Sequence, residues 1–455
     1  MMRIALRVLP WFLALAPAFS QMTLEQVVQD AGAKHPAVRA SLEQVSAAAA
    51  AVNLARTAYL PKADFDAQLN RATHNNIFGL LLPAGGVFPG ISGPVLGTNS
   101  LENVWGSAVG VLVQWESFDF GQRRASVDAA EASRHRAAAQ VAVTRLQAVT
   151  AAADAYLTLL AAGQTVKAAQ AGVERARVLN DVVGALVANQ LRPGAEGSRA
   201  RAELALAETQ LIQAQQAVEV GRAALAQVLG VPPAQIAIVP GRLLELPAES
   251  AVPPPSPPQA HPLAAAQKEA VAEVQAREKV LDRSWYPRFN VAGGVYARGT
   301  GIQPDGSTGN AASGLGPNIQ NWVVGMNVTF PAFELPAIKA RKEVERYRER
   351  AEQARYEQVL QDLNGELARA RALLDGARRV AANTPVQLEA AQATEQQATA
   401  RYKAGLGTIV EVAEAQRLRT QAEIEDGLAR LAVWRALLGL AVAQGDLTGF
   451  VQLTR

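Results

Sequence analysis

The sequence contains no cysteine and only four histidines in 455 residues. Without thiols the chain can form neither disulfides nor thiolate metal sites. No pair among His35, His74, His135 and His261 has the spacing of metal ligands, so we expect no metal ion and no other cofactor. Nucleophile–base motifs, Gly-rich phosphate loops and paired catalytic carboxylates are missing as well, and we therefore do not expect an enzyme.

An excess of charge of either sign is also missing. The chain has 44 Lys and Arg against 41 Asp and Glu, and without Arg3 and Arg7 the count is 42 against 41, a net charge of +1. There is no run of Lys or Arg that would bind phosphates, so we expect no nucleic-acid partner. Beyond the N-terminal region no uninterrupted apolar run of ~18 residues occurs, so a membrane helix is not expected and a membrane segment would have to be a barrel.

The only long apolar run lies at the N-terminus. Arg3 and Arg7 precede the apolar stretch Ile4–Ala16, and Ala18-Phe19-Ser20 has the small-x-small pattern of a cleavage site. A transmembrane anchor is the alternative, but the run is short and polar Gln21 follows it directly. We therefore predict that residues 1–20 are a secretory signal peptide.

The most informative feature that is present is an internal duplication. His35-Pro36 recurs as His261-Pro262, and Glu196 recurs as Glu411. The interval, roughly 220 residues, is far longer than the ~20–50-residue units of solenoids, so it indicates a duplicated half-protein. We divide the chain into the signal peptide, a first repeat (21–230), a Pro-rich linker (231–260) and a second repeat (261–455).

Most of each repeat is rich in Ala, Gln, Glu and Arg, with apolar residues at three- and four-residue spacing, which predicts long amphipathic helices. At 1.5 Å per residue the longest helices span about 100 Å, and helices of that length need neighbours along their apolar sides, so coiled-coil packing is expected. Pro385 should kink its helix or mark a short irregular insert. Ile236–Val239 in the linker can form a short strand. The predicted helices are Leu24–Ala58, Gln122–Ala188, Ala195–Leu229, Leu263–Ser284, Ala337–Ala404 and Thr408–Gln444.

Four further segments alternate between bulky apolar residues and small or polar residues, as strands do. Each repeat carries two of them between its first and second helices. They are Asp64–Asn70, Trp105–Trp115, Phe289–Val295 and Trp322–Phe330.

Aromatic residues mark the ends of these strands. Trp105 and Trp115 lie on one face and are separated by about 33 Å of strand, or roughly 24 Å of height at a 45° tilt, which suits the ~25 Å apolar band of a membrane barrel. With Trp322 and Phe330 they form a predicted aromatic girdle in contact with lipid. A soluble sandwich with the tryptophans in its core is the alternative. Because four strands cannot close a barrel, a barrel requires several chains.

Several motifs together resemble a known family. They are Tyr59-Leu60-Pro61 and Trp285-Tyr286-Pro287 before the strands, Phe118-Asp119-Phe120-Gly121 before a long helix, and the segment Tyr402–Val412 with Glu414. With the duplication, they make the chain similar to the TolC-like outer-membrane efflux family over essentially the whole mature sequence.

The resemblance implies a mainly α protein with duplicated long coiled-coil helices and a small membrane β part of four transmembrane strands per chain. It implies a homotrimer that shares a 12-stranded β-barrel in outer-membrane lipid and continues as an α-helical periplasmic tunnel. The function implied is a passive exit duct for efflux or secretion, which works with a periplasmic adaptor protein and an inner-membrane transporter. A periplasmic adaptor or a structural coiled-coil protein is the alternative.

The resemblance also assigns site residues. It implies that Glu411 and Glu414 form an acidic ring at the pore mouth, with Glu196 at the corresponding place in the first repeat, and that Tyr402 belongs to the closed gate. Gly407 stands where the best-known members have a gate arginine. Solvated surface acids are the alternative for the three glutamates.

The turns between the long helices and the helices that follow them are the expected adaptor contacts. Helix termination by Pro193, Gly194, Gly405 and Gly407 is a second, compatible interpretation. The predicted contact residues are Leu191, Arg192, Pro193, Gly194, Gly405, Leu406, Gly407 and Thr408.

Overall fold

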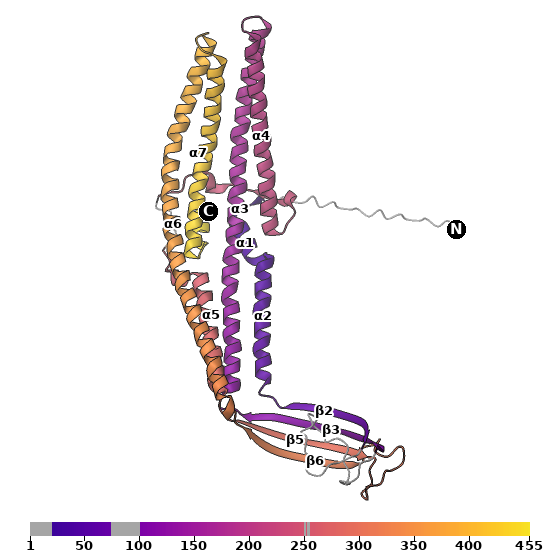
Figure 1. Cartoon of the computed structure of the whole chain (residues 1–455). Helices are drawn as coiled ribbons and strands as arrows, with labels where there is room; N and C mark the ends of the chain where they lie inside the picture. Colours follow the sequence, from indigo (N-terminus) through magenta and orange to yellow (C-terminus); the bar gives the residue numbers. More distant parts are fainter. Residues whose placement is uncertain (1–20, 74–100, 250–251, 253–254) are drawn as a thin grey trace, which may run out of the picture. The chain divides into compact units, whose positions relative to one another are not determined.

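The computed structural model describes residues 21–73, 101–249, 252 and 255–455. The predicted signal peptide, His74, most of the loop between the first two predicted strands and part of the Pro-rich linker lie outside these residues. The described chain forms two compact units, of which the helical unit contains the described residues up to Val45, Arg136–Lys268 and Ala354–Arg455. The sheet unit contains Ser46–His135 and Glu269–Gln353, so each unit draws on both repeats (Figure 1).

Five of the six predicted helices are confirmed with small shifts at their ends. The two longest have 67 and 69 residues, and the helix that follows each of them has 36, so the two repeats match in length. The helices are α1 (Leu24–Lys34), α2 (Pro36–Thr57), α3 (Gln122–Ala188), α4 (Gly194–Leu229), α5 (Pro262–Arg283), α6 (Leu335–Lys403), α7 (Ile409–Gln444) and α8 (Thr448–Leu453). Short 3-10 helices are η1 (Pro233–Gln235), η2 (Gly241–Leu244), η3 (Pro258–Ala260) and η4 (Ala332–Glu334).

One predicted helix is divided in two before a proline. The segment predicted as one helix from Leu24 to Ala58 is broken at His35, which has φ −57° and ψ 132°, because Pro36 disfavours the helical conformation of the residue before it. Pro385 lies inside α6, which is one continuous helix, so it does not mark an irregular insert, and a kink at Pro385 stays a prediction.

The repeated His-Pro pair begins a helix in both repeats. The backbone N–H of Ala37 donates to Nδ1 of His35 at 3.2 Å, and that of Leu263 donates to Nδ1 of His261 at 3.1 Å. His261 also lies 3.2 Å from the carbonyl of Val442, so its Nε2 carries the proton and donates. Burial lowers the pKa of His261, which favours this neutral form. Each histidine therefore caps a helix, and no group of His, Asp or Glu in the described chain is arranged to hold a metal ion.

The helical unit has a large apolar core and a small one. The large core is built around fully buried residues such as Tyr156, Leu225, Leu437 and Phe450. The predicted linker strand is present as β4 (Ala237–Ile238), which pairs in parallel with β1 (Gln21–Met22) beside this core. Helix α3 contains one window that is long and apolar enough to cross a membrane by composition, but 44% of that window is buried, as in many core helices.

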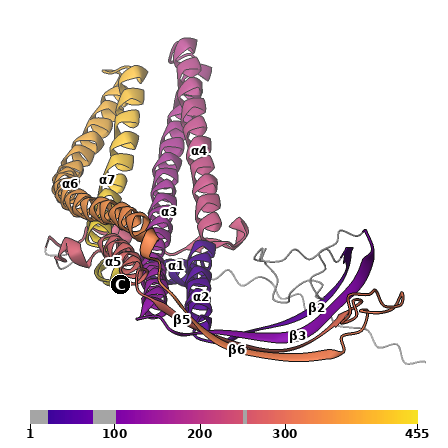
Figure 2. The same ribbon diagram turned by 60° about the horizontal axis from the view of Figure 1, so that its bottom comes forward.

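The sheet unit contains the four predicted strands in the order β2-β3-β5-β6, all antiparallel (Figure 2). Each repeat contributes one hairpin, and β3 and β5 join the two. Within the described chain, β2 and β6 have no partner on their outer sides. Their bounds are β2 (Lys62–Thr73), β3 (Asn103–Phe118), β5 (Arg288–Thr300) and β6 (Ile319–Thr329).

The register confirms the predicted faces of the sheet. Phe65 lies opposite Val111, Val111 opposite Val295, and Val295 opposite Trp322, so one face is apolar across all four strands. These side chains are exposed, and that of Trp322 is 78% accessible. The other face carries small and polar residues from every strand. An apolar sheet face of this extent on the protein surface marks a contact with lipid or with another chain.

The Phe118-Asp119-Phe120-Gly121 motif forms the turn between β3 and α3. Phe120 and Gly121 have positive φ of 52° and 90°. The buried carboxylate of Asp119 accepts hydrogen bonds from the backbone N–H groups of Gly121 (3.1 Å) and Arg123 (2.6 Å) and from Nε of Arg123 (3.0 Å). Although desolvation alone would raise it, the pKa of Asp119 is lowered by these bonds. One carboxylate therefore fixes the direction in which the chain leaves the sheet.

We expect Asp119→Asn to destabilise the protein by about 1–3 kcal/mol, because the donors around it lose a charged acceptor. The contribution of Asp119 is present above the ordinary carboxyl pKa and is lost as the pH falls through its lowered folded pKa. Thermal unfolding at pH 7 and pH 3 measures both effects. The exposed Asp128, on α3 nearby, provides the control substitution Asp128→Asn. An equal effect of the two substitutions would contradict this assignment.

Candidate gate at the helix ends

The two turns that join the long helices to their successors lie at one end of the helical unit, and residues 189–193 and 404–408 are called the tip turns here. The second ends α6 with Gly405 at φ 75° and a hydrogen bond from Leu406 N to Arg401 O at 2.9 Å. Thr408 then caps α7 by accepting from the backbone N–H of Glu411 at 3.3 Å. Gly405 supplies the left-handed residue that this helix end requires.

The first tip turn has the same geometry with a different residue at its centre. Gln190, at the position equivalent to Gly405, has φ 58°, and Leu191 N donates to Leu186 O at 2.9 Å. The sequence interpretation missed Gln190, because a non-glycine residue gives no signal for a left-handed conformation. It also misplaced Gly194, which begins α4 and does not end α3.

Helices α3 and α4 form one helical hairpin, and α6 and α7 form the other. A hydrogen bond joins these two helical hairpins close to the tip turns. The hydroxyl of Tyr402 on α6 donates to the carboxylate of Glu196 on α4 at 2.8 Å. The guanidinium of Arg192 lies 4.8 Å from the centre of the Tyr402 ring, donates to the Tyr402 carbonyl at 3.3 Å and lies 3.7 Å from the Glu196 carboxylate. The tyrosine therefore sits between an arginine and a glutamate that both come from the other hairpin.

Tyr402 is 3% exposed and belongs to the small apolar core of the unit. Burial and the neighbouring Glu196 carboxylate raise the pKa of Tyr402 to about 12, so its hydroxyl remains a donor over the whole physiological range. The other members of this core are Leu179, Val183, Ala200, Ile409 and Val412.

The three predicted pore glutamates have different surroundings. The Glu414 side chain is 70% exposed and pairs with Arg417, and the Glu411 side chain is 47% exposed and lies 3.9 Å from Arg401. The Glu196 side chain is only 19% exposed and is bonded to Tyr402. The structure therefore separates Glu196, an acceptor within the protein, from the two accessible carboxylates of α7.

Gly407 lies in crowded surroundings, although its backbone is not strained. A Cβ atom there would lie 3.3 Å from Arg401 Cβ, from Glu411 Oε2 and from the backbone N of Tyr402. The guanidinium groups near the tip turns instead come from Arg192 and Arg401.

The predicted girdle residues lie in or beside the sheet. The guanidinium of Arg71 lies 5.2 Å from the centre of the Trp105 ring, and Nε1 of Trp115 donates to the Tyr59 carbonyl at 3.0 Å. The register aligns Trp322 with Val111, between the two tryptophans of β3, and Phe330 follows the end of β6. The four aromatic residues thus do not form one row of cross-strand neighbours.

Sequence comparison identifies the family to which this architecture belongs. A profile described as outer membrane efflux protein matches residues 27–231 and 259–446, which include most of both repeats. The chain belongs to the outer membrane efflux protein family. This confirms the resemblance found in the sequence and assigns the efflux protein to the outer membrane as a channel with a long periplasmic helical part. Among curated proteins, no sequence matches it significantly.

Solved structures agree with this assignment. The outer-membrane channel OprN is 21% identical, with a TM-score of 0.72 over 94% of this chain and 91% of its own. CmeC of Campylobacter jejuni is 17% identical, with a TM-score of 0.74 over 94% and 86%. The open state of MtrE from Neisseria gonorrhoeae is 19% identical, with a TM-score of 0.69 over 93% and 89%. At these identities the likeness establishes the fold, which is the helical one predicted from the sequence.

We expect Tyr402→Phe to destabilise the efflux protein by about 1.5–3 kcal/mol at pH 8, since the hydroxyl donates to a charged group. The contribution is complete below the ordinary tyrosine pKa of 10 and is lost as the pH rises through about 12. Thermal unfolding at pH 8 and pH 11 should therefore show a smaller difference between wild type and variant at the higher pH. The control is Tyr347→Phe, because the Tyr347 ring is largely exposed. A difference that does not depend on pH would count against the Tyr402–Glu196 bond.

Proposed function

We propose that three copies of the efflux protein form one passive exit duct, with a 12-stranded barrel in the outer membrane and a helical tunnel in the periplasm. A periplasmic adaptor and an inner-membrane transporter supply the substrate and the energy. The observation that carries this proposal is the four-stranded sheet, which combines an apolar face with two unpaired edges.

The edges of the sheet set the requirement for other copies. Backbone N–H and C=O groups without partners cost several kcal/mol each in hydrocarbon, so a spanning sheet must close into a barrel. Four strands are too few, since the smallest membrane barrels have about eight. Pairing β6 of one copy with β2 of the next satisfies both edges, and three copies give a barrel of twelve strands.

The apolar face supplies the second support for the proposal and the first test. Val324 is 71% exposed on that face, and the next residue, Gly325, faces the other way with nothing within 4 Å of a Cβ placed there. We expect Val324→Lys to cost about 2–4 kcal/mol if this position lies near the bilayer midplane, and Gly325→Lys to cost much less. Urea unfolding in lipid vesicles compares the two variants.

Gly325 is a better control than glycines elsewhere in the sheet. A Cβ at Gly110 would lie 2.4 Å from Tyr296 Cβ, so a substitution there disturbs packing whichever way the residue faces. If Val324→Lys and Gly325→Lys destabilise the protein equally, the apolar face does not contact lipid, and the sandwich interpretation returns.

The tip turns have the properties of a protein contact. Leu191 is 68% exposed and Leu406 is 74% exposed, and the two occupy equivalent positions in the repeats. Exposed leucines at matching places are expected where a partner meets the same element twice. Residues Leu191–Gly194 and Gly405–Thr408 are therefore the proposed contacts with the adaptor.

We propose that the gate at this end is held by Arg192, Glu196 and Tyr402, and that Glu411 and Glu414 line the mouth. In a trimer these two glutamates would place six carboxylates around the pore. Like charges confined between helices of low dielectric raise the negative potential and attract cations, divalent cations most strongly.

The double substitution Glu411→Gln with Glu414→Gln should lower cation preference and weaken block by divalent cations in planar bilayers. Glu219, which is exposed on α4 and paired with Arg222, provides the control substitution Glu219→Gln. Trimer mass in detergent is measured on the same preparations. Unchanged selectivity and block in the double variant would return Glu411 and Glu414 to ordinary surface acids, and a monomer would contradict the shared barrel.

A further inference from the structure

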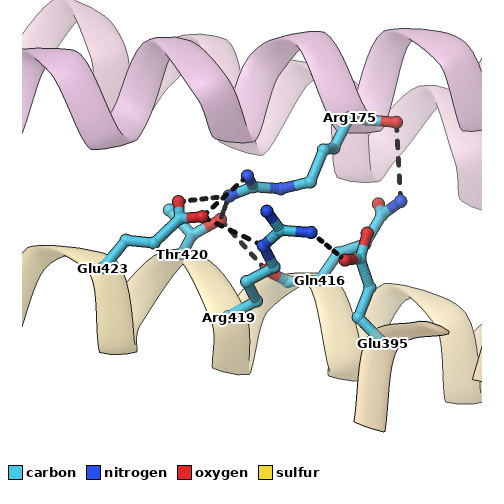
Figure 3. Close-up of polar contacts among 6 residues, drawn as sticks. All are labelled: Arg175, Glu395, Gln416, Arg419, Thr420 and Glu423. Atoms are coloured by element: carbon cyan, nitrogen blue, oxygen red, sulfur yellow. Dashed lines mark hydrogen bonds and ion pairs between the residues drawn. The ribbon is translucent and has the colours of Figure 1, made fainter. Parts of the chain in front are cut away.

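A half-buried ion pair joins the two helical hairpins, α3–α4 and α6–α7, away from the tip turns. Arg175 on α3 donates to both carboxylate oxygens of Glu423 on α7, at 3.1 and 2.8 Å, and to the hydroxyl of Thr420 at 2.7 Å (Figure 3). The side chains of Arg175 and Glu423 are 16% and 18% exposed. Two other ion pairs between the hairpins, Arg417–Glu203 and Arg435–Asp154, each include a partner that is more than 40% exposed.

The pair belongs to a larger polar cluster. Nε of Arg419 donates to Glu423 at 3.0 Å, and its Nη1 donates to Glu395 on α6 at 2.6 Å (Figure 3). The Glu395 side chain is 11% exposed. One carboxylate is thus held between two guanidinium groups, and three helices meet there. We call Arg175, Glu395, Arg419, Thr420 and Glu423 the clasp.

The clasp separates the two apolar cores of the unit. On α7, the small core near the tip turns contains Ile409 and Val412, and the large core begins at Ala429. Glu423 lies between them, about 21 Å along the helix from Ile409 at 1.5 Å per residue. Opposite Thr420, a Cβ placed at Gly172 would lie 3.0 Å from its hydroxyl, so α3 and α7 approach each other closely at the clasp.

The duplication shows that the clasp is specific to this junction. In the register that aligns Glu196 with Glu411, only Glu423 keeps its residue type, in Glu208. The remaining clasp residues correspond to uncharged side chains, which are Ala390 for Arg175, Asn180 for Glu395, Leu204 for Arg419 and Ala205 for Thr420. The clasp is therefore not part of what the two repeats share, and it joins α3 to α7 through residues that only this pair of helices carries.

We propose that the clasp is the fulcrum of the gate, which means that Arg175 and Glu423 stay paired when the tip turns separate. Opening is then confined to the part of the helical hairpins that lies between the clasp and the tip turns. The inference rests on the proposed function of the tip turns as a gate. The Glu423 carboxylate accepts two charge-assisted hydrogen bonds from Arg175 and a third from Arg419, whereas the Tyr402 hydroxyl makes one hydrogen bond to Glu196, so the tips separate first.

The absence of cysteine makes the first test direct. The Cβ atoms of Gly172→Cys and Thr420→Cys would lie 3.7 Å apart, within the range of a disulfide, and would lock α3 to α7. Gly197→Cys with Val187→Cys, at 3.9 Å, is the matched control that links α3 and α4 within one hairpin. Free-thiol titration establishes that each disulfide has formed.

Conductance in planar bilayers is then compared in the Tyr402→Phe background, in which the tips are released. A fulcrum predicts that oxidation leaves the raised conductance of the Gly172→Cys/Thr420→Cys trimer unchanged, as in the control pair. A several-fold loss of conductance on oxidation that dithiothreitol reverses, seen only with the pair across the clasp, would show that the clasp itself must open. That result would overturn the proposal.

The second test removes the charge of the clasp carboxylate. Glu423→Gln in the Tyr402→Phe background should raise conductance further, because opening of the helical hairpins no longer stops at the clasp. Glu425→Gln is the control, since Glu425 lies two residues away and accepts from Gln387 and Gln421, both within its own hairpin. Equal conductance of the two variants would contradict the fulcrum.

Hydrogen exchange on the purified trimer separates failure of this inference from failure of the proposed function. In the Tyr402→Phe protein, faster exchange should be limited to residues 176–188 and 409–422, and Glu423→Gln should extend it to 429–441. Exchange that spreads past Glu423 while the clasp is intact would overturn the fulcrum, whether or not the protein conducts. Absence of any conductance in all variants would instead contradict the duct.

Discussion

Satisfaction of the backbone hydrogen bonds at the two sheet edges is the constraint on which the proposed architecture depends. The sheet combines an exposed apolar face with edges on β2 and β6 that have no partner in the described chain. A soluble protein can leave such edges to water, but a sheet surrounded by hydrocarbon cannot. In the proposed trimer, pairing with other copies closes these edges, and each chain adds two β-hairpins of the same kind.

The two repeats agree where the backbone needs a fixed geometry and differ where charge is used. His35 and His261 cap equivalent helices, and Gln190 and Gly405 turn the chain at equivalent places. Within the described residues, the Tyr402–Glu196 bond and the clasp around Glu423 are not repeated at the equivalent positions. The duplication supplies the long helices and the strands, and unrepeated polar contacts join the two helical hairpins.

The charges at the helix ends are arranged so that few of them are free inside the protein. Tyr402 and Glu196 satisfy each other, and Arg192 lies against both, so the absence of an arginine at Gly407 leaves no buried carboxylate without a cation. Glu411 and Glu414 remain accessible at the start of α7. The ends of the two helical hairpins therefore combine polar groups paired inside the protein with exposed negative charge.

The sequence by itself determined the duplication, the long helices, the strands and the separation of sheet faces, because periodicity of 3.6 or 2 residues is a local property. The helix break at His35 was also predictable from the sequence, because a residue before a proline is disfavoured in the helical conformation. The sequence could not show the left-handed Gln190, the burial of Glu196, the Asp119–Arg123 turn or the clasp. Arg175 and Glu423 are 248 residues apart in sequence, and only the tertiary packing of α3 against α7 brings their charges together at a half-buried place, where water screens them less than at the surface.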